Sequence, residues 1–333
     1  MQNACDEPHV PVLLEESLAA LAIREDGIYV DATFGRGGHA RAMLAVLGPR
    51  GKVVAVDRDP AAASVAQSID DQRFSFRRAV FSELPHVLDD IGISRVHGAL
   101  LDLGVSSPQL NDAERGFSYR FDGPLDMRMD PSRGESAAAF VARASIGELA
   151  EVIRSYGEER FAKSIARAIA TAREIRPIAT TRELAAVVAQ AIGARTRGDW
   201  RQDPAARTFQ ALRIAVNGEL QELSVALPML TAHLATEGRL AVISFHSLED
   251  RIVKRFLAFA SRPFGGDARL ARMPIREAAL PGAPLRVVGR AIKPSIAEVT
   301  RNPRARSAIL RVAERTAHAL PDNWPRAFEG GSR

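Results

Sequence analysis

The segment 27–39, GIYVDATFGRGGH, constrains the fold more than any other part of the chain. Its apolar run at 28–30 predicts a short buried strand of a parallel sheet, and Asp31 ends that run with a charge. Three glycines between positions 35 and 38 then predict a sharply turned loop, and 40–47 predicts a helix. A strand, a glycine loop and a helix together form a unit that binds nucleotide-type ligands.

The glycine spacing leaves more than one interpretation open. Gly35-x-Gly37-Gly38 is not the dinucleotide fingerprint Gly-x-Gly-x-x-Gly, because Ala40 stands in its last place, yet that fingerprint tolerates alanine there. Asp57 follows the next predicted strand, 53–56, about 20 residues past the glycines, where an acid that binds ribose hydroxyls is expected. A nicotinamide-dependent oxidoreductase is therefore an alternative, and a tight turn without a ligand is another.

Further strands predict one shared ligand edge. Segments 74–77 and 96–101 have strand character, Phe81 lies just beyond the first and Asp102 ends the second. Alternation of strands with helices, including one that Asp59 and Pro60 start, predicts a parallel α/β sheet with right-handed crossovers. Because ligands bind at the carboxyl ends of such strands, we expect Phe81 to share this edge with the strand-ending acids.

The middle of the chain predicts a second, mostly helical region. Segment 103–133 is long and rich in turn residues, which is typical of functional loops. Capping boxes at Ser145-x-x-Glu148 and Thr180-x-x-Glu183 and a basic helix over 160–173 follow. We expect a methyltransferase-type sheet domain in two parts, 1–111 and 206–315, an inserted helical domain at 112–205, and a loose C-terminal tail at 316–333.

The predicted second half of the sheet domain begins with a long helix from Asp203 that carries an apolar stripe as far as Leu220. Strands at 239–244, 285–292 and 308–313, a helix at 248–259 opened by Ser247-x-x-Asp250, and a loop at 261–284 complete it.

Composition narrows the classes of partner. The net charge is +5, the pI is about 9.8, and nearly all cations are arginines, whose side chains bind phosphate well. Either an RNA or DNA substrate or a compositional bias explains this surplus of arginine. Cys5 is the only cysteine and the seven histidines are scattered, so we expect no disulfide and no metal. Without an apolar run that spans a bilayer or a leader sequence, we expect a soluble, cytoplasmic protein and no membrane partner.

Eight motifs in a fixed order resemble the bacterial ribosomal RNA small-subunit methyltransferase H family, over about residues 9–315. They are 9–16 (HVPVLLEE), 31–39 (DATFGRGGH), 102–109 (DLGVSSPQ), 116–118 (GFS), 124–130 (PLDMRMD), 156–160 (YGEER), 244–251 (SFHSLEDR) and 302–307 (NPRARS).

The resemblance implies a Rossmann-like class I S-adenosylmethionine-dependent methyltransferase sheet with an inserted, mostly helical domain. It also implies methylation of the exocyclic N4 of a cytosine in 16S rRNA, at the decoding centre of the small ribosomal subunit. The family's cofactor contacts carry over onto Gly37, Gly38, His39, Asp57, Phe81, Asp102 and Gln109. A non-enzymatic ribosome assembly factor that retains this fold is an alternative.

The chemistry of N4 methylation suggests roles for a few side chains. Cytosine N4 is a poor nucleophile, so acceptors must hold its N–H groups, and the candidates are Asp102, Ser107 and Pro108. Many amino-methyltransferases carry Asp/Asn/Ser-Pro-Pro-aromatic here, whereas Gln109 and Leu110 follow Pro108 in this chain. Base stacking must then come from elsewhere, and the candidates are Phe117, Tyr119 and Phe121.

Other polar residues have two interpretations each. His39 could cap its helix instead of contacting a ligand, and His246 with Glu249 could contact substrate or, as we prefer, cap and pack the following helix. The arginines of the inserted domain, and Arg301, Arg304 and Arg306, could hold RNA phosphates or form a solvated surface.

Overall fold

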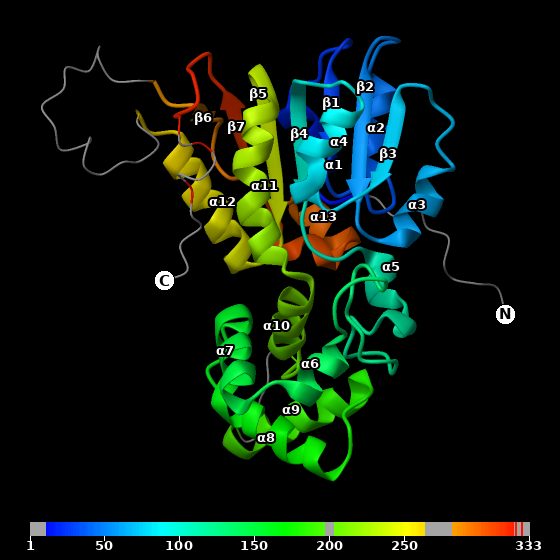
Figure 1. Ribbon diagram of the computed structural model, residues 1–333, viewed down its shortest axis with the longest axis vertical. Helices are drawn as coiled ribbons and strands as arrows, with labels where there is room; N and C mark the ends of the chain where they lie inside the picture. Colours follow the sequence, from blue (N-terminus) through cyan, green and yellow to red (C-terminus); the bar gives the residue numbers. More distant parts are fainter. Residues whose placement is uncertain (1–10, 197–202, 264–281, 323, 325–327, 329–333) are drawn as a thin grey trace, which may run out of the picture. The chain divides into compact units, whose positions relative to one another are not determined.

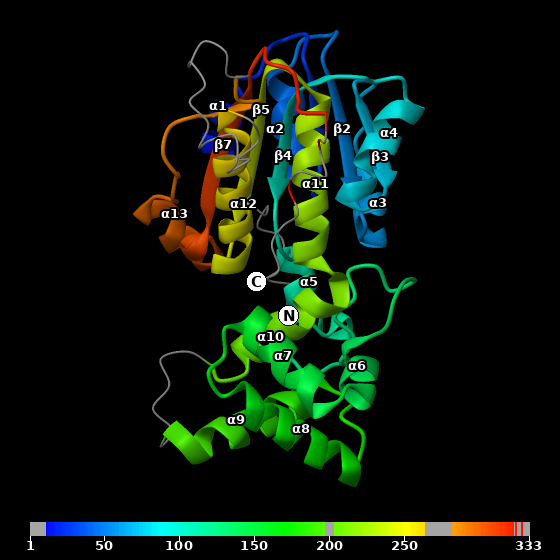
Figure 2. The ribbon, with the colours of Figure 1, turned by 60° about the vertical axis from the view of Figure 1, so that its left-hand side comes forward.

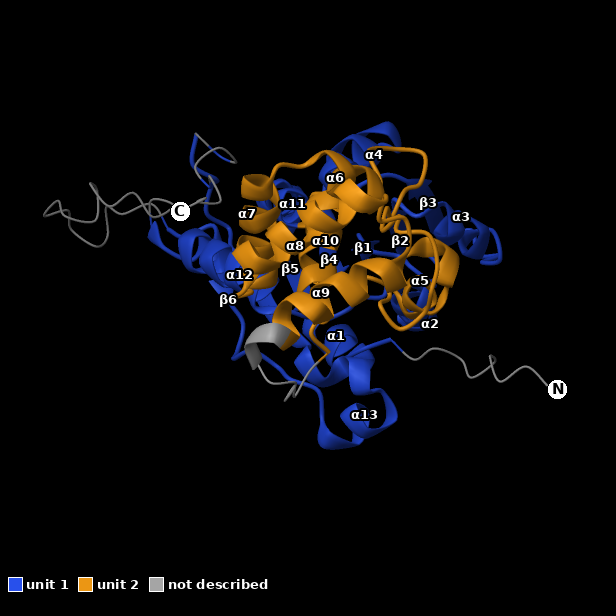
Figure 3. Cartoon of the chain, turned by 90° about the horizontal axis from the view of Figure 1, so that it is seen from below, with its two compact units in different colours: residues 1–104, 220–333 blue, residues 105–219 orange. Residues whose placement is uncertain are grey.

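The computed structural model describes residues 11–196, 203–263, 282–322, 324 and 328. The chain divides into two compact units, Met1–Gly104 with Leu220–Arg333, and Val105–Glu219 (Figure 3). The second unit extends beyond the predicted inserted domain, 112–205, at both ends.

The described part of the first unit is built on a seven-stranded sheet in the order β3-β2-β1-β4-β5-β7-β6 (Figure 1). Strands β1 to β5 pair in parallel, whereas β7 is antiparallel to both β5 and β6. This arrangement confirms the predicted Rossmann-like α/β sheet. The strands are β1 Ile28–Asp31, β2 Lys52–Asp57, β3 Phe74–Arg78, β4 Val96–Asp102, β5 Leu234–Ser244, β6 Leu285–Val287 and β7 Ile309–Arg315.

Helices cover both faces of this sheet (Figure 2). Successive residues of β2 alternate between two cores: Val54 and Val56 pack with α4, α11 and α12, and Val53 and Ala55 pack with α1, α2 and α3. The helices of this unit are α1 Leu14–Leu21, α2 Gly38–Val46, α3 Pro60–Ala66, α4 Leu84–Asp90, α11 Glu219–His233, α12 Ser247–Ala260 and α13 Ile296–Arg301, with 3-10 turns η1 Phe81–Glu83 and η6 Pro303–Ser307.

The second unit is helical in its described residues and has its own apolar core. Both predicted capping boxes form: Ser145 with Glu148 at α7, and Thr180 with Glu183 at α9. Its elements are α5 Ser107–Asn111, η2 Ala113–Arg115, α6 Ala137–Arg143, α7 Ile146–Gly157, α8 Ala162–Ile175, α9 Thr181–Thr196 and α10 Ala206–Asn217.

The predicted long helix from Asp203 through Leu220 is wrong as a single element. α10 ends at Asn217, and Gly218 adopts a left-handed conformation with φ of 62°. A left-handed glycine terminates a helix, so α11 begins afresh at Glu219.

Two aromatic residues of the predicted loose tail are packed. The Phe328 ring lies 5.1 Å from that of Phe256 on α12, and the Trp324 ring lies 6.0 Å from that of Phe259. Trp324 Nε1 also donates to the carbonyl of Pro228 at 2.8 Å. At these two positions the tail is held more closely than predicted. Residues 1–8 and most of the predicted loop at 261–284 lie outside the described residues.

Candidate ligand site at the sheet edge

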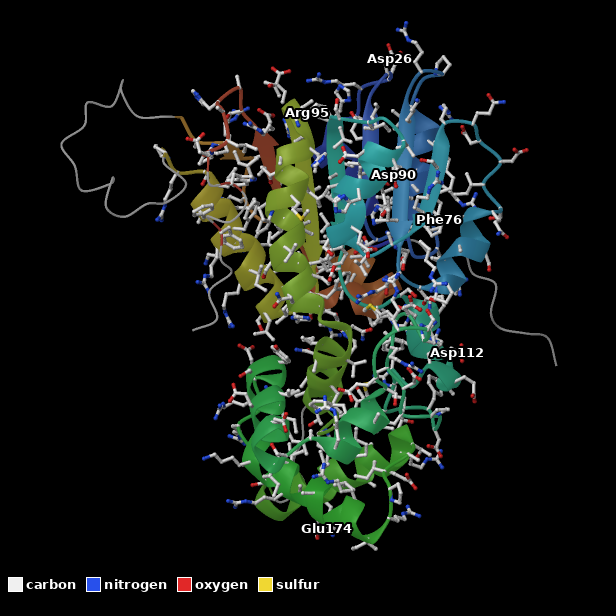
Figure 4. All side chains as sticks on the ribbon, viewed as in Figure 1. Asp26, Phe76, Asp90, Arg95, Asp112 and Glu174 are labelled. Carbon is white, nitrogen blue, oxygen red and sulfur yellow. The ribbon has the colours of Figure 1, made fainter. Side chains whose placement is uncertain are left out.

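Three acids end neighbouring strands at one edge of the sheet. Asp31 pairs in register with Ala55, two residues before Asp57, and also with Leu100, two residues before Asp102. Figure 4 labels Asp26 and Arg95 at the opposite edge, where β1 and β4 begin. The structure therefore brings the three predicted acids to the edge at which ligands bind in α/β sheets.

The glycine loop leaves no room for a side chain at Gly37 or Gly38. A Cβ on Gly38 would lie 2.2 Å from Pro11 Cγ, and one on Gly37 would lie 2.7 Å from a ring carbon of Phe34. Gly35 and Gly37 also have φ of +53° and +75°, a conformation that glycine adopts without strain. The loop therefore presents bare backbone next to the start of α2.

The start of α2 has no side-chain cap. Gly37 is the N-cap residue, and no side chain of the described residues caps the helix by a hydrogen bond. The interpretation of His39 as a helix cap is therefore wrong. Uncapped N–H groups and the helix dipole make such an end a binding site for a carboxylate or another anion.

His39 belongs instead to a buried charged cluster with Asp31 and Asp102. Its Nε2 lies 3.5 Å from Oδ2 of Asp102, and its side chain is 5% exposed. Burial opposes the imidazolium charge, but Asp102 and Asp31 outweigh burial and raise the pKa of His39. We infer that His39 carries a proton more readily than a free histidine.

The buried cluster has unused hydrogen-bonding atoms. Asp31 is buried, and burial raises its pKa to about 6 even though the nearby His39 lowers it. Asp31 Oδ1 accepts from the Thr33 N–H at 3.2 Å. Among the described residues, no partner is found for Asp31 Oδ2, His39 Nδ1 or Asp102 Oδ1. Buried polar atoms without partners are rare in proteins, so these three fit the donors and acceptors of a polar ligand.

Asp57 has a different environment. Its two carboxylate oxygens accept from the Gly35 N–H at 2.7 Å and the Asp59 N–H at 2.8 Å. Burial raises the pKa of Asp57, more than these two hydrogen bonds lower it. Each oxygen of a carboxylate accepts more than one bond, so Asp57 retains capacity for hydroxyl groups. Asp59 caps α3 through the Ala61 N–H at 2.9 Å, as predicted.

Phe81 lies just beyond β3, in η1, as its position in the sequence predicts. Its side chain is half-buried and packs against the core that contains α4. A contact of Phe81 with adenine stays a prediction.

The three residues predicted from the segment after β4 lie in α5 of the second unit. Ser107 and Pro108 begin this helix, and Gln109 forms a capping box with Ser106. Gln109 Oε1 accepts from the Ser106 N–H at 2.7 Å. The pattern Ser-x-x-Gln signals this box in the sequence, although we did not predict it.

The three aromatic candidates for base stacking differ in exposure. Phe117 is 5% exposed within the core of the second unit. The prediction that it stacks on the base is therefore wrong, because the core covers its ring. The Tyr119 ring packs edge-on against Phe209 at 5.7 Å. Phe121 is 45% exposed, which leaves it as the accessible candidate among the three.

His246 and Glu249 cap α12, which is the interpretation that we preferred. His246 Nδ1 accepts from the Glu249 N–H, and the Glu249 carboxylate accepts from the Phe245 N–H at 2.8 Å. The predicted capping pair, Ser247 and Asp250, is wrong by one residue. Asp250 instead forms an ion pair with Arg311, with a 2.6 Å distance from Nε to Oδ1.

One arginine of the predicted phosphate-binding set has a structural role. Arg173 Nη1 donates to the carbonyls of Val141 at 2.6 Å and Ala144 at 2.7 Å, at the end of α6. It is therefore a poor candidate for phosphate. The described residues hold no group of three or more metal-ligating side chains, and none of their helices is long and apolar enough to cross a membrane.

Comparison with known proteins identifies relatives over nearly the whole chain. Residues 6–316 match the model of the MraW methylase family. A protein of Thiobacillus denitrificans named ribosomal RNA small subunit methyltransferase H is 58% identical over 93% of this chain and 98% of its own. A protein of the same name from Azoarcus is 59% identical over 92% of this chain and 96% of its own length. A solved structure described as a putative rRNA methylase from Clostridium thermocellum covers 94% of this chain and 100% of its own, at 11% identity and a TM-score of 0.43.

Proposed function

This chain belongs to the MraW methylase family, and from that premise we propose that it methylates the exocyclic N4 of a cytosine in 16S rRNA, at the decoding centre of the small ribosomal subunit. At the coarser level, it is an S-adenosylmethionine-dependent methyltransferase of small-subunit rRNA, as the name of relatives 53–59% identical to it indicates. Work on ribosomal RNA would place the enzyme in the cytoplasm.

The observation that carries the proposal is the set of unpartnered buried atoms beside the uncapped start of α2. S-adenosylmethionine presents a carboxylate and an amine at one end and a ribose at the other. The N–H groups at the start of α2 would hold the carboxylate, and Asp102 would accept from the amine. Asp57 would accept from the ribose hydroxyls. Phe81 would lie against the adenine, and Gln109 completes the proposed contacts.

When bound, the cofactor supplies an electrophilic methyl group on a sulfonium. The protein's task is then to orient the acceptor, because positioning contributes much of the rate of such a displacement. The lone pair of cytosine N4 is delocalised into the ring, so oxygens of Asp102, Ser107 or Pro108 would hold the N–H groups and turn the lone pair outward. The target base must leave its stack to be reached, and the exposed ring of Phe121 would support it.

Transfer of tritiated methyl from S-adenosylmethionine tests the proposal. We expect label in small-subunit rRNA, offered free or as assembled subunits, and N4-methylcytidine on nucleoside digestion and mass spectrometry. An Asp57→Ala variant should transfer far less. Label in another nucleoside would contradict the N4 assignment.

Two rival functions are separated by simpler measurements. A nicotinamide-dependent oxidoreductase would be stabilised by NAD in a thermal-shift assay, whereas we expect stabilisation by S-adenosylhomocysteine. An assembly factor without activity would bind small subunits and transfer no label.

A further inference from the structure

Residues 290–307, between β6 and β7, form a basic segment that the cofactor site does not use. It carries five exposed cations, which are Arg290, Lys293, Arg301, Arg304 and Arg306. Its one acid, Glu298, accepts the Leu13 N–H on Oε1 at 2.7 Å. The acid therefore faces the body of the unit, and the exposed charge of the basic segment is positive.

The register of the sheet places the end of this segment at the ligand edge. Ile243 of β5 pairs with Asp102, and the next residue, Ser244, pairs with Ile309, the first residue of β7. The residues immediately before Ile309 therefore lie at the edge where β4 ends in Asp102. Figures 1 and 2 both draw α13 at the arrowhead end of the parallel strands.

The basic segment is anchored to the face of the sheet that carries the glycine loop. Ala305 and Ala308 are buried in the same apolar cluster as Phe34 and Ala40, which flank the loop. The bond from Leu13 to Glu298 adds a polar attachment two residues from Pro11, which packs against Gly38. A ligand on the basic segment would therefore be held in a fixed position relative to the cofactor loop.

We propose that residues 290–307 are a docking surface for the phosphate backbone of the RNA substrate, with Arg301 and Arg306 as principal contacts. This inference rests on the proposed function, because it names where the first unit holds that substrate. Four of the five cations are arginines, whose planar fork binds a phosphate through two hydrogen bonds. An RNA whose target base reaches Asp102 would bring its backbone near the edge at which this segment ends.

A double variant, Arg301→Gln with Arg306→Gln, tests this surface. Its matched control is Arg24→Gln with Arg50→Gln, which removes the same charge from exposed ion pairs with Glu237 and Asp26 at the opposite edge. The substrate is whichever form of small-subunit rRNA, free or assembled, the wild-type protein methylates. Binding is measured against salt concentration, with KM and kcat for that RNA and affinity for S-adenosylhomocysteine.

We expect the test variant to bind RNA about tenfold more weakly, with a salt slope shallower by about 1.5, since each lost phosphate contact removes roughly 0.7–0.9 from that slope. Its KM for RNA should rise by a similar factor, while kcat and affinity for S-adenosylhomocysteine match those of the control. Equal RNA affinity and equal salt slope in the two double variants would contradict the proposed docking surface. Absence of methyl transfer by the wild-type protein would instead overturn the proposed function and this inference with it.

Discussion

Two corners of the sheet share the same order of elements but differ in how their polar groups are hydrogen-bonded. In each, a strand ends in an aspartate and a helix follows, Asp31 before α2 and Asp57 before α3. At the second corner, backbone N–H groups bond both oxygens of Asp57, and Asp59 caps the helix. At the first, one oxygen of Asp31 has no partner within the described residues, and α2 has no side-chain cap.

This difference indicates which corner satisfies its hydrogen-bonding groups without a ligand. The Asp57 corner satisfies its own backbone and then offers spare acceptor capacity to a ribose. Within the described residues, the Asp31 corner leaves buried side-chain atoms without partners and α2 without a side-chain cap, which costs stability unless a ligand bonds these groups. The first corner therefore lowers the stability of the ligand-free protein and gains bonds when a ligand binds, whereas the second corner is a scaffold that is complete without one.

Asp57→Ala should produce the largest loss of stability. It leaves the Gly35 and Asp59 N–H groups without their acceptor, and we expect about 4 kcal/mol less free energy of unfolding, from two partly buried donors. Urea denaturation measures this loss. Asp57→Asn retains one acceptor oxygen and should lose less; equal losses in the two variants would contradict the scaffold role.

Asp31→Asn should change how stability depends on pH. The pKa of Asp31 in the folded protein is about 6, above its ordinary value of 3.8, so the folded state binds more protons between these values and stability falls as pH rises through that window. The wild-type protein should lose about 2 kcal/mol between pH 4 and 6 through this group, and the variant should not.

The raised pKa of His39 has a separate effect. Its stabilisation is present below the ordinary histidine pKa of 6.5 and is lost as pH rises through the higher folded value. Unfolding of both proteins without cofactor, measured from pH 4 to 8, distinguishes the two windows. Parallel curves between pH 4 and 6 would contradict the buried charge of Asp31.

Gly38→Ala should distort the open corner without unfolding the protein. The new Cβ would meet Pro11 Cγ at 2.2 Å, so the loop or Pro11 must shift, at about 2 kcal/mol for a tight contact. We expect affinity for S-adenosylhomocysteine, measured by calorimetry, to fall at least tenfold. Gly147→Ala is the control, since its Cβ lies 3.8 Å from the nearest neighbour, Ser145 Oγ, and its affinity should match wild type.

Asp59→Ala should have the smallest effect and be confined to stability. It removes the N-cap of α3, which is worth about 1 kcal/mol. The cofactor atoms do not need this cap, so affinity for S-adenosylhomocysteine should be unchanged when measured well below the unfolding temperature. A loss of affinity as large as that of Gly38→Ala would remove the distinction between the two corners.

The sheet edge was predictable because local patterns encode it. Short apolar strands each ended by an acid, the glycine loop, and the Asp59-Pro60 helix start all rest on neighbouring residues. The alternation of strands and helices predicted a parallel sheet with right-handed crossovers, whereas the order of the strands comes from the structure.

Features that depend on tertiary partners were missed. The sequence offers two caps for α12, His246 with Glu249 and Ser247 with Asp250, and only the fold shows that Asp250 is committed to Arg311. Phe117 resembles an exposed loop aromatic in the sequence, yet the core of the second unit buries it. The charged cluster of His39 joins α2 to β1 and β4, a convergence that residue spacing does not encode.

The position of β7 inside the sheet has a consequence for synthesis. Residues 309–315 supply the strand that joins β5 to β6, so the sheet is incomplete until residue 315 has emerged from the ribosome. Residues 105–219 are contiguous and can fold as soon as they emerge. Until β7 joins the sheet, β5 is paired with β4 alone, and its other edge is open to pairing with another chain.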